Sequence, residues 1–341
     1  VAAMAEKGQY NEALDAVPQS FKKDSKRTYL SAPYFDTLAA VYPTLEHQME
    51  TFRDTVSSAV TSGTYTVFTI RNLSDYLCMH PGSDSVQKLL SSTAAVKKDA
   101  LSLSEASGIL HVYAELNTKN KTLASLLAPA AAACIERISS VCALDGSRLT
   151  IAENGTFVPV AQGVEAGDAI LQCGKASGDE TLTKAGYLLL DSYLSDSASF
   201  DLRTLADLYP VIIHNNPMYP HFAILSFDSG EASWAWTCAT SLKYAKDSLG
   251  SITLTIDFPQ EYTHYIIVNG IKAFSSIYIY EMAFRTDPRF ETYNSSGYVF
   301  LSSKNTLLLK SRHKSEIETV RLLYSTAAKE AEESKSLTAP D

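Results

Sequence analysis

The stretch SITLTIDF, residues Ser251 to Phe258, decides the fold class. Within it, apolar side chains occupy every second position from Ile252 to Phe258, and Thr or Asp fills the positions between them. A period of two residues is typical of a β-strand with one face buried. The sequence therefore predicts that a β region begins at Ser251.

Further stretches with strand character follow this one and are separated by turn residues. They are 262–268, 276–284, 297–301, 306–310 and 319–324. The first of them ends at Asn269-Gly270, a pair that supplies the positive φ angles of a tight hairpin turn. About six antiparallel strands in so short a region indicate a small sandwich or barrel. We predict an antiparallel β-sandwich over residues 251–325.

Upstream of Ser251, apolar residues recur at every third or fourth position, which is typical of amphipathic helices. Examples are residues 34–60, 104–116 and 122–141. An Asn154-Gly155 turn predicts a short β-hairpin at 149–160 that interrupts the helices. The fold class is thus α+β, with a helical-hairpin region followed by the sandwich.

The clearest helical hairpin is AGDAILQCGKASGDETLTKAGYLLLDSYL, residues 166–194. Two helices meet there around Gly178-Asp179. The facing positions on the first helix are Ile170, Leu171 and Gly174, and those on the second are Leu182, Ala185, Leu188 and Leu189.

A chain of 341 residues exceeds the roughly 250–300 residues at which single cores stop growing, so several domains are expected. We predict an N-terminal helical bundle at 1–144, a helical-hairpin segment at 145–250, the sandwich at 251–325 and a linker-like tail at 326–341. Near the start, Gly8, Tyr10, Ala13 and Leu14 resemble half of one tetratricopeptide repeat. No 34-residue period follows, which predicts a single local hairpin. The helical start and the charged tail lead us to expect a removed upstream segment and a further domain downstream.

The composition excludes some function classes. A formal net charge of −9 without a basic stripe argues against nucleic acid or an anionic membrane as partner. No apolar run approaches the roughly 20 residues that span a bilayer, so we predict no membrane insertion.

The five cysteines are widely spaced without a CxxC pair, which predicts buried free thiols and no metal site. No nucleotide-binding or serine-hydrolase motif is present, and no cofactor is expected.

Residues 145–245 resemble (α/α)-toroid proteins that process glycans. The likeness rests on a helix ending in GKASGDE, a second helix rich in Ala, Gly and Leu, and the later segments DLRTLADLYPVI and AWTCATSL. The order of helical domain and β-sandwich also resembles that of toroid polysaccharide lyases. Separately, FRTDPRFETYNSSGYVF, residues 284–300, resembles uncharacterised spirochaete envelope proteins. These resemblances imply an extracytoplasmic location, in the periplasm or at the cell surface, and a glycan or envelope protein as partner.

The densest polar and aromatic cluster is HNNPMYPHF, residues 214–222. In a lyase, Asn and a protonated His would neutralise a uronate carboxylate, and a Tyr or His would take the proton from C5. The candidate catalytic residues are His214, Asn216, Tyr219, His221 and the upstream Arg203. Trp234 and Trp236 would stack on sugar rings as ligand-binding residues. The competing interpretation is a proline-rich loop joining two domains, whose polar and aromatic side chains pack the interface.

A second candidate ligand-binding group lies in the predicted sandwich and consists of Arg285, Asp287, Arg289 and Tyr293. Charges at alternate positions of a strand lie on one face, which suits either a polar ligand or an exposed ladder of ion pairs. Nearby, His313 lies among Lys310, Arg312 and Lys314, a basic run that predicts a solvated strand end.

Two functions remain open from the sequence. The first is a non-catalytic scaffold or binding protein that presents surfaces to a glycan or protein partner. The alternative is a polysaccharide lyase or glycosidase with its site between the helical and β domains.

Overall fold

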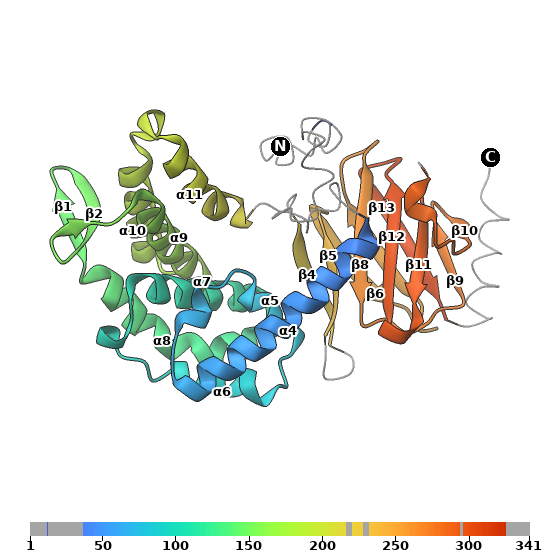
Figure 1. The fold of residues 1–341 in the computed structure, drawn as a ribbon, viewed down its shortest axis with the longest axis horizontal. Helices are drawn as coiled ribbons and strands as arrows, with labels where there is room; N and C mark the ends of the chain where they lie inside the picture. Colours follow the sequence, from blue (N-terminus) through green and yellow to red (C-terminus); the bar gives the residue numbers. More distant parts are fainter. Residues whose placement is uncertain (1–11, 13–36, 216–219, 228–231, 294–295, 325–341) are drawn as a thin grey trace. The chain divides into compact units, whose positions relative to one another are not determined.

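The computed structural model describes residues 12, 37–215, 220–227, 232–293 and 296–324 of the chain. The chain forms two compact units. A helical unit comprises Met49–Asn215, and a β unit comprises Val1–Gln48 together with Asn216–Asp341. The predicted order of a helical region and an antiparallel β-sandwich is confirmed (Figure 1). The predictions for Gly8 to Leu14 and for the tail at 326–341 lie outside the described residues.

Helices dominate the described residues up to Asn215. They are α4 (Leu38–Ser62), α5 (Leu73–Met79), α6 (Asp84–Thr93), α7 (Leu103–Lys119), α8 (Lys121–Ser139), α9 (Val160–Ser177), α10 (Glu180–Leu194) and α11 (Leu202–Ile212), with 3₁₀ turns η1 (Thr66–Thr69), η2 (Lys98–Ala100), η3 (Ser197–Ser199) and η4 (Ile213–Asn215). A three-stranded antiparallel sheet, β1 (Cys142–Asp145), β2 (Arg148–Glu153) and β3 (Thr156–Phe157), interrupts them. The predicted turn joins β2 to β3, with φ of 51° at Asn154 and 78° at Gly155.

Local chemistry sets where the two central helices begin. Ser102 and Glu105 form a capping box at the start of α7, in which each side chain accepts the other's backbone N–H. Asn120 ends α7 and opens α8, because its side chain accepts a hydrogen bond from Leu123 N at 3.2 Å. This shared residue turns the chain sharply, and α8 packs against α7.

The predicted hairpin of α9 and α10 is confirmed, and small residues let its helices approach closely. A Cβ atom at Gly174 would lie 2.5 Å from the Thr183 nitrogen, and one at Gly186 would lie 2.6 Å from the Leu171 nitrogen. Asp179 caps α10 by accepting from two backbone N–H groups. One predicted facing position is wrong, since the Leu188 side chain is 48% exposed.

Helix α8 is the described helix that is long and apolar enough to cross a membrane, judged by length and composition alone. A third of its apolar stretch is buried. The core helices of soluble proteins meet the same criterion. Leu123, Leu127, Cys134 and Ile138 form its buried face, as expected of a helix that packs in a bundle.

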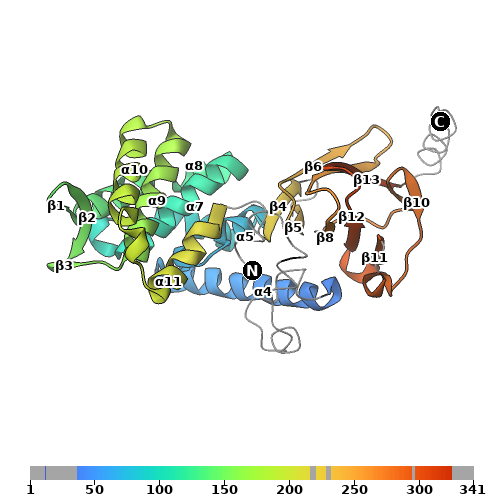
Figure 2. The ribbon, with the colours of Figure 1, turned by 90° about the horizontal axis from the view of Figure 1, so that it is seen from above.

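The β unit contains two five-stranded antiparallel sheets. Their strands are β4 (His221–Ser226), β5 (Ser233–Thr237), β6 (Ser241–Lys246), β7 (Ile252–Asp257), β8 (Thr263–Asn269), β9 (Ser276–Ile279), β10 (Met282–Phe284), β11 (Gly297–Leu301), β12 (Thr306–Arg312) and β13 (Ile317–Leu323). One sheet has the order β10-β9-β13-β7-β6, and the other has the order β11-β12-β8-β5-β4. Figure 2 shows them as two layers.

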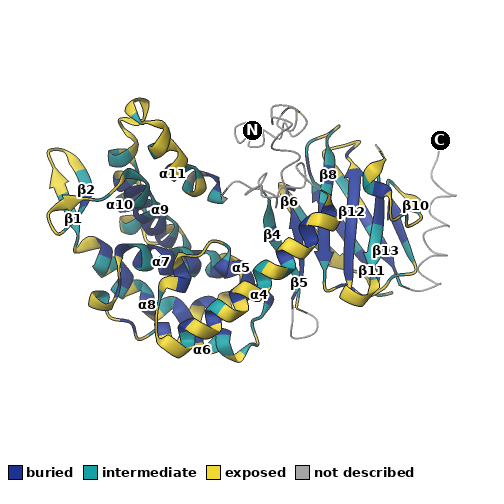
Figure 3. Ribbon diagram, in the orientation of Figure 1, coloured by how far each residue is buried: buried dark blue, intermediate teal, exposed yellow. Residues whose placement is uncertain are grey.

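The core of the sandwich lies between the two sheets. On β7 the side chains of Ile252, Leu254 and Ile256 are buried and alternate with half-buried residues, as predicted. They pack with apolar residues of the opposite sheet, among them Ile266 and Leu307. In Figure 3 the inner strands of both sheets are accordingly coloured as buried.

The prediction that helices continue to about residue 250 is wrong, because β4, β5 and β6 already belong to the sandwich. Strand β5 lies between β4 and β8, and its residues from Trp234 to Thr237 are all buried. A strand buried on both faces has no polar alternation, so its continuous apolar run does not differ in pattern from a buried helix. The segment AWTCATSL, which resembles a toroid helix, therefore forms parts of two strands.

The first turn of α4 belongs to the β unit and is held by Glu291. The two carboxylate oxygens of Glu291 accept hydrogen bonds from Leu38 N at 2.5 Å and Ala39 N at 3.2 Å. A carboxylate at a helix N-terminus satisfies free N–H groups and faces the positive end of the helix dipole. Helix α4 begins where this residue, far along the chain, can cap it.

The basic run around His313 is not the solvated strand end that its sequence predicts. His313 is 1% exposed and Lys310 is 5% exposed, whereas Arg312 and Lys314 are exposed. The amine of Lys310 donates hydrogen bonds to the carbonyl oxygens of Glu291 and Tyr293. Strand β12 is buried from Thr306 to Ser311, and within it Lys310 is stabilised by these carbonyl partners.

Candidate functional site

Of the five predicted catalytic residues, His214 lines a pocket, which is in the helical unit. Arg203 is exposed on α11 of the same unit but does not line that pocket. His221 is half-buried on β4 in the β unit. Asn216 and Tyr219 lie outside the described residues. The catalytic cluster proposed from the sequence is thus not assembled by the described part of the chain.

The predicted ligand-binding residues all lie in the β unit. Trp234 and Trp236 are 8% and 2% exposed on β5, so neither ring offers an open face to a sugar. Arg285, Asp287 and Arg289 follow β10 in a loop and do not alternate along a strand. The Arg289 guanidinium lies 5.7 Å from the centre of the exposed Tyr293 ring and 3.5 Å from the carboxylate of Asp287. The charges of Arg289 and Asp287 are therefore balanced by each other within the loop.

The pocket that contains His214 has a volume of about 170 Å³. Its walls come from η1 and the start of α5, from α7, from α9, and from the end of α11 with η4. The apolar wall includes Phe68, Ile70 and Val112, and the polar wall includes His111, Glu115, Glu165, Asp168 and His214. The pocket therefore brings two imidazoles and three carboxyl groups together inside one unit.

Gly108 of α7 allows one wall of the pocket to form. A Cβ atom at this position would lie 2.3 Å from the carbonyl oxygen of Phe68 in η1, which is backbone and cannot swing away. The 3₁₀ turn η1 is thus packed directly against α7. Only a residue without a side chain permits this approach.

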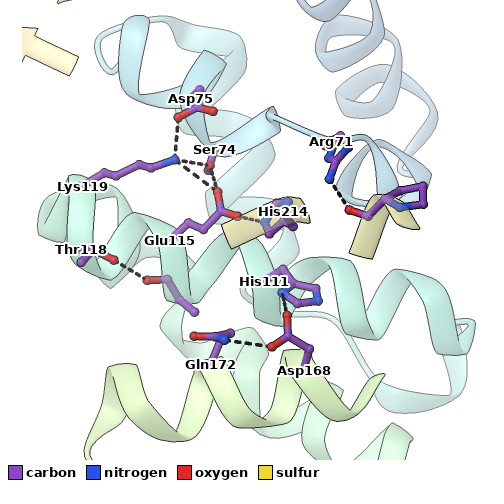
Figure 4. Close-up of polar contacts among 12 residues, drawn as sticks. Arg71, Ser74, Asp75, His111, Glu115, Thr118, Lys119, Asp168, Gln172 and His214 are labelled. Carbon is purple, nitrogen blue, oxygen red and sulfur yellow. Dashed lines mark hydrogen bonds and ion pairs between the residues drawn. The ribbon is translucent and has the colours of Figure 1, made fainter. Parts of the chain in front are cut away.

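Glu115 of α7 is the centre of the polar network (Figure 4). Its carboxylate accepts hydrogen bonds from the ring of His214 and from the hydroxyl of Ser74, and Lys119 Nζ lies 3.4 Å away. Burial alone would raise the pKa of Glu115, but the His214 hydrogen bond and the Lys119 charge outweigh it and lower the pKa to about 2. Glu115 is therefore a fixed negative charge that orients His214.

Lys119 connects Glu115 to a second buried carboxylate. Its amine donates to Asp75 at 2.5 Å, and the Asp75 side chain is 7% exposed. Burial would lower the pKa of Lys119, but Asp75 and Glu115 together hold it above its usual value. The network thus runs from Asp75 on α5 through Lys119 and Glu115 on α7 to His214 in η4. Asp75 is negative, Lys119 positive and Glu115 negative, so neighbouring charges along it attract.

A second imidazole–carboxylate pair lies beside the first. His111 Nδ1 is 3.9 Å from an oxygen of Asp168 on α9, and Gln172 donates to the other Asp168 oxygen at 2.9 Å. Burial lowers the pKa of His111, an effect that Asp168 opposes and His214 reinforces. The rings of His111 and His214 are 5.8 Å apart between centres. At neutral pH, His111 is therefore a neutral base next to an oriented histidine.

Glu165 of α9 differs from the other acidic residues of the pocket. Within the described part of the chain its carboxyl group makes no side-chain hydrogen bond. Burial raises its pKa, although His214 counteracts this. A carboxyl group that is half-buried, faces a pocket and lacks a partner is available to a ligand or as a proton donor.

The wall formed by His111, Glu115 and His214 also borders a second cavity of about 280 Å³. Thr118, Gln172 and Lys175 line the other side of this cavity, so it is polar where the first pocket is partly apolar. The two imidazoles are thus accessible from two differently lined spaces. Among the described residues, no group of three or more His, Cys, Asp or Glu side chains has the geometry to hold a metal ion.

The sequence does contain a signal for the pocket residues. His111 and Glu115 are four residues apart on α7, and Glu165 and Asp168 are three apart on α9. Both spacings place the pair on one face of its helix. Such pairs also occur on many solvated helices, so the contact between α7 and α9 was needed to recognise the site.

The chain matches no protein-family model, no curated protein and no solved structure.

Proposed function

We propose that this protein is a binding protein whose helical unit holds a small, hydroxyl-rich ligand in the His111–His214 pocket. The proposal rests on the Glu165 carboxyl, which has no side-chain partner among the described residues and lies in the same pocket as the hydrogen-bonded His214–Glu115 pair and the neighbouring His111 and Asp168 side chains. Carboxylates and imidazoles accept and donate hydrogen bonds to sugar hydroxyl groups. The pocket is smaller than the roughly 300–1,000 Å³ typical of drug-sized ligands, which favours one sugar ring or the end of a glycan.

The resemblances to glycan-processing toroids and to envelope proteins support an extracytoplasmic location and a glycan as ligand. We propose that the β unit, on which Met282, Tyr293 and Ile317 are exposed, binds the envelope protein partner. In this proposal the β unit has the scaffold role and the helical unit has the binding role.

Isothermal titration with a panel of neutral, amino and uronic sugars tests the proposal. We expect at least one sugar to bind, and we expect Glu165→Gln to weaken its affinity about tenfold by removing a charged hydrogen-bond partner. Glu180→Gln on the exposed start of α10 is the matched control and should bind like the unmodified protein. Absence of binding across the panel, or equal affinity in Glu165→Gln, would contradict the proposal.

A second candidate function is a polysaccharide lyase or glycosidase that uses the same pocket. It is favoured by the His214–Glu115 pair together with Glu165, because an oriented imidazole suits a general base and burial raises the pKa of the Glu165 carboxyl in the direction that suits a proton donor. In a lyase reaction, His214 takes the C5 proton of a uronate, the C4–O bond breaks, and Glu165 protonates the leaving oxygen as the C4=C5 bond forms.

The ultraviolet absorbance of unsaturated uronates tests this second function. Incubation with uronate polymers should increase the absorbance, and both His214→Ala and Glu165→Gln should abolish the increase. Sugar binding without any such product, and without released reducing sugar from neutral glycans, would leave the binding function and exclude the enzyme.

A further inference from the structure

The β unit buries two histidines against each other, independently of the pocket in the helical unit. His264 on β8 is 0% exposed, and His313, which directly follows β12, is 1% exposed. Their rings lie 5.6 Å apart between centres and are nearly perpendicular. Phe258 contacts both rings, at 4.8 Å and 5.3 Å between centres. The pair is thus part of the sandwich core.

Each of the two rings has one nitrogen bonded and one without a partner. His264 Nε2 lies 2.7 Å from the hydroxyl of Thr237, and His313 Nδ1 lies 3.2 Å from the carbonyl oxygen of Ser315. His264 Nδ1 and His313 Nε2 are buried without a hydrogen-bond partner within the described residues. A carbonyl oxygen only accepts, so His313 carries its proton on Nδ1 and leaves the Nε2 lone pair bare. A second proton on either ring would therefore be buried without an acceptor.

The charged neighbours of the two rings differ. Near His264 the titratable groups are His313 and His221, and both disfavour a positive charge on it. Near His313 the carboxylates of Glu318 and Asp257 and the carbonyl groups of Ser315 and Glu316 favour a charge, but burial outweighs them. The pKa is lowered at both residues, and more strongly at His264 because burial and both neighbouring histidines act together.

We propose that His264 and His313 form an acid-operated switch, in which the neutral pair keeps the sandwich closed and proton uptake opens it. The sandwich is closed while both rings are neutral, because Phe258 and the two sheets then enclose them completely. On acidification, the open state gains hydrated imidazolium ions that the closed state cannot accommodate.

The direction of the pH dependence follows from proton binding. Unfolded histidines titrate near pH 6.5, and the folded pair titrates lower, so the open state binds more protons below about pH 6.5. Stability is complete above this pH and is lost as the pH falls below it. Two protons change the opening equilibrium by up to ~100-fold for each pH unit.

Tryptophan fluorescence reports on the β unit alone, because the chain has two tryptophans and both lie on β5. The full chain is unfolded in urea at several pH values between 5 and 8, and this fluorescence gives the equilibrium constant for unfolding of the β unit. We expect this unfolding constant to be steady above pH 6.5. Below it, the unfolding constant should rise by more than about 10-fold, and by up to about 100-fold, per pH unit. A constant that does not change between pH 7 and pH 5 would overturn the proposal.

Variants test whether these two residues are responsible. His313→Phe keeps an aromatic ring beside Phe258, and His264→Gln keeps a partner for Thr237. Each should reduce the slope to about 10-fold per pH unit, and the double variant should remove most of it. His47→Gln, on the exposed side of α4, is the matched control and should leave the slope unchanged. An undiminished slope in the double variant would assign the switch elsewhere and contradict the proposal.

A measurement on the unmodified protein covers the case in which the variants do not fold. Imidazole nitrogen NMR signals assigned to His264 and His313 should remain those of neutral rings while the β unit is folded, and should become those of charged rings only as it unfolds. Ordinary titration of these two histidines near pH 6.5 in the folded protein would also overturn the proposal.

Discussion

The ring of His214 donates a hydrogen bond to the carboxylate of Glu115, although 99 residues separate the two in the sequence. Because Lys119 and Ser74 hold the same carboxylate, His214 is oriented by a charge that does not move. The network gives the pocket a fixed geometry before any ligand arrives, which reduces the entropy lost on binding.

Glu115→Gln should destabilise the helical unit. The substitution keeps the shape of the side chain but removes the negative charge that faces Lys119 and His214. Hydrogen bonds to charged groups contribute about 1.5–3 kcal/mol, and we expect the free energy of unfolding to fall by an amount in this range. Urea unfolding followed by helical circular dichroism measures it. The control is Glu180→Gln, whose exposed pair with Lys184 should contribute nothing measurable.

Acid should remove the contribution of Glu115 to the free energy of unfolding. Its pKa is about 2 in the folded protein against 4.5 for an unperturbed Glu, so the unfolded chain takes up this proton first as the pH falls. The contribution to stability is complete above about pH 4.5 and is lost between there and pH 2. The difference in unfolding free energy between the unmodified protein and Glu115→Gln should shrink toward zero over this range. A constant difference from pH 6 to pH 2.5 would be the contrary result.

Gly108→Ala should deform the pocket wall. The added methyl group would meet the Phe68 carbonyl, and overpacking of this kind costs about 1–3 kcal/mol. Gly178→Ala is an informative control, because nothing lies within 4 Å of its Cβ position but its φ of 71° disfavours a side chain. We expect both to lower the melting temperature, but only Gly108→Ala should shift the NMR signals of His111 and His214.

Thiol labelling should separate the five cysteines, all of which are free. Cys78, Cys134, Cys173 and Cys238 are buried, and burial raises the pKa of Cys78 and Cys134 to about 12 and that of Cys173 to about 11. Cys142 is half-buried, so we expect it to react first, and slowly, in the native protein. Cys142→Ser should then leave no reactive thiol until denaturant is added. Rapid labelling of that variant would show that another cysteine is accessible.

The fold was predictable wherever a single pattern repeats. The alternation on β7 and the small residues between α9 and α10 both gave the observed elements. The pattern misled at β5, because a central strand buried on both faces has no polar positions to reveal its period. The boundary at Ser251 was therefore placed three strands too late.

The pocket was predictable only through His214. Its partners Glu115 and His111 are on α7, and Glu165 is on α9, in sequences that suit solvated helix faces equally well. What makes them a site is the tertiary contact of α7 with α9 and η1, which depends on Gly108 and on long-range packing. Spacing along one helix does not contain that information.

The cap on α4 imposes an order on the folding of a newly made chain. The backbone N–H of Leu38 cannot bond to the Glu291 carboxylate until the 253 residues from Leu38 to Glu291 have been synthesised. At the roughly 5–20 residues per second of protein synthesis, about 13–50 s pass before the cap can form. All of Met49–Asn215 is made within that interval, so the helical unit can fold on the ribosome while the first turn of α4 still lacks its partner. Slowing synthesis downstream of Asn215 should therefore prolong a state in which only the helical unit resists protease.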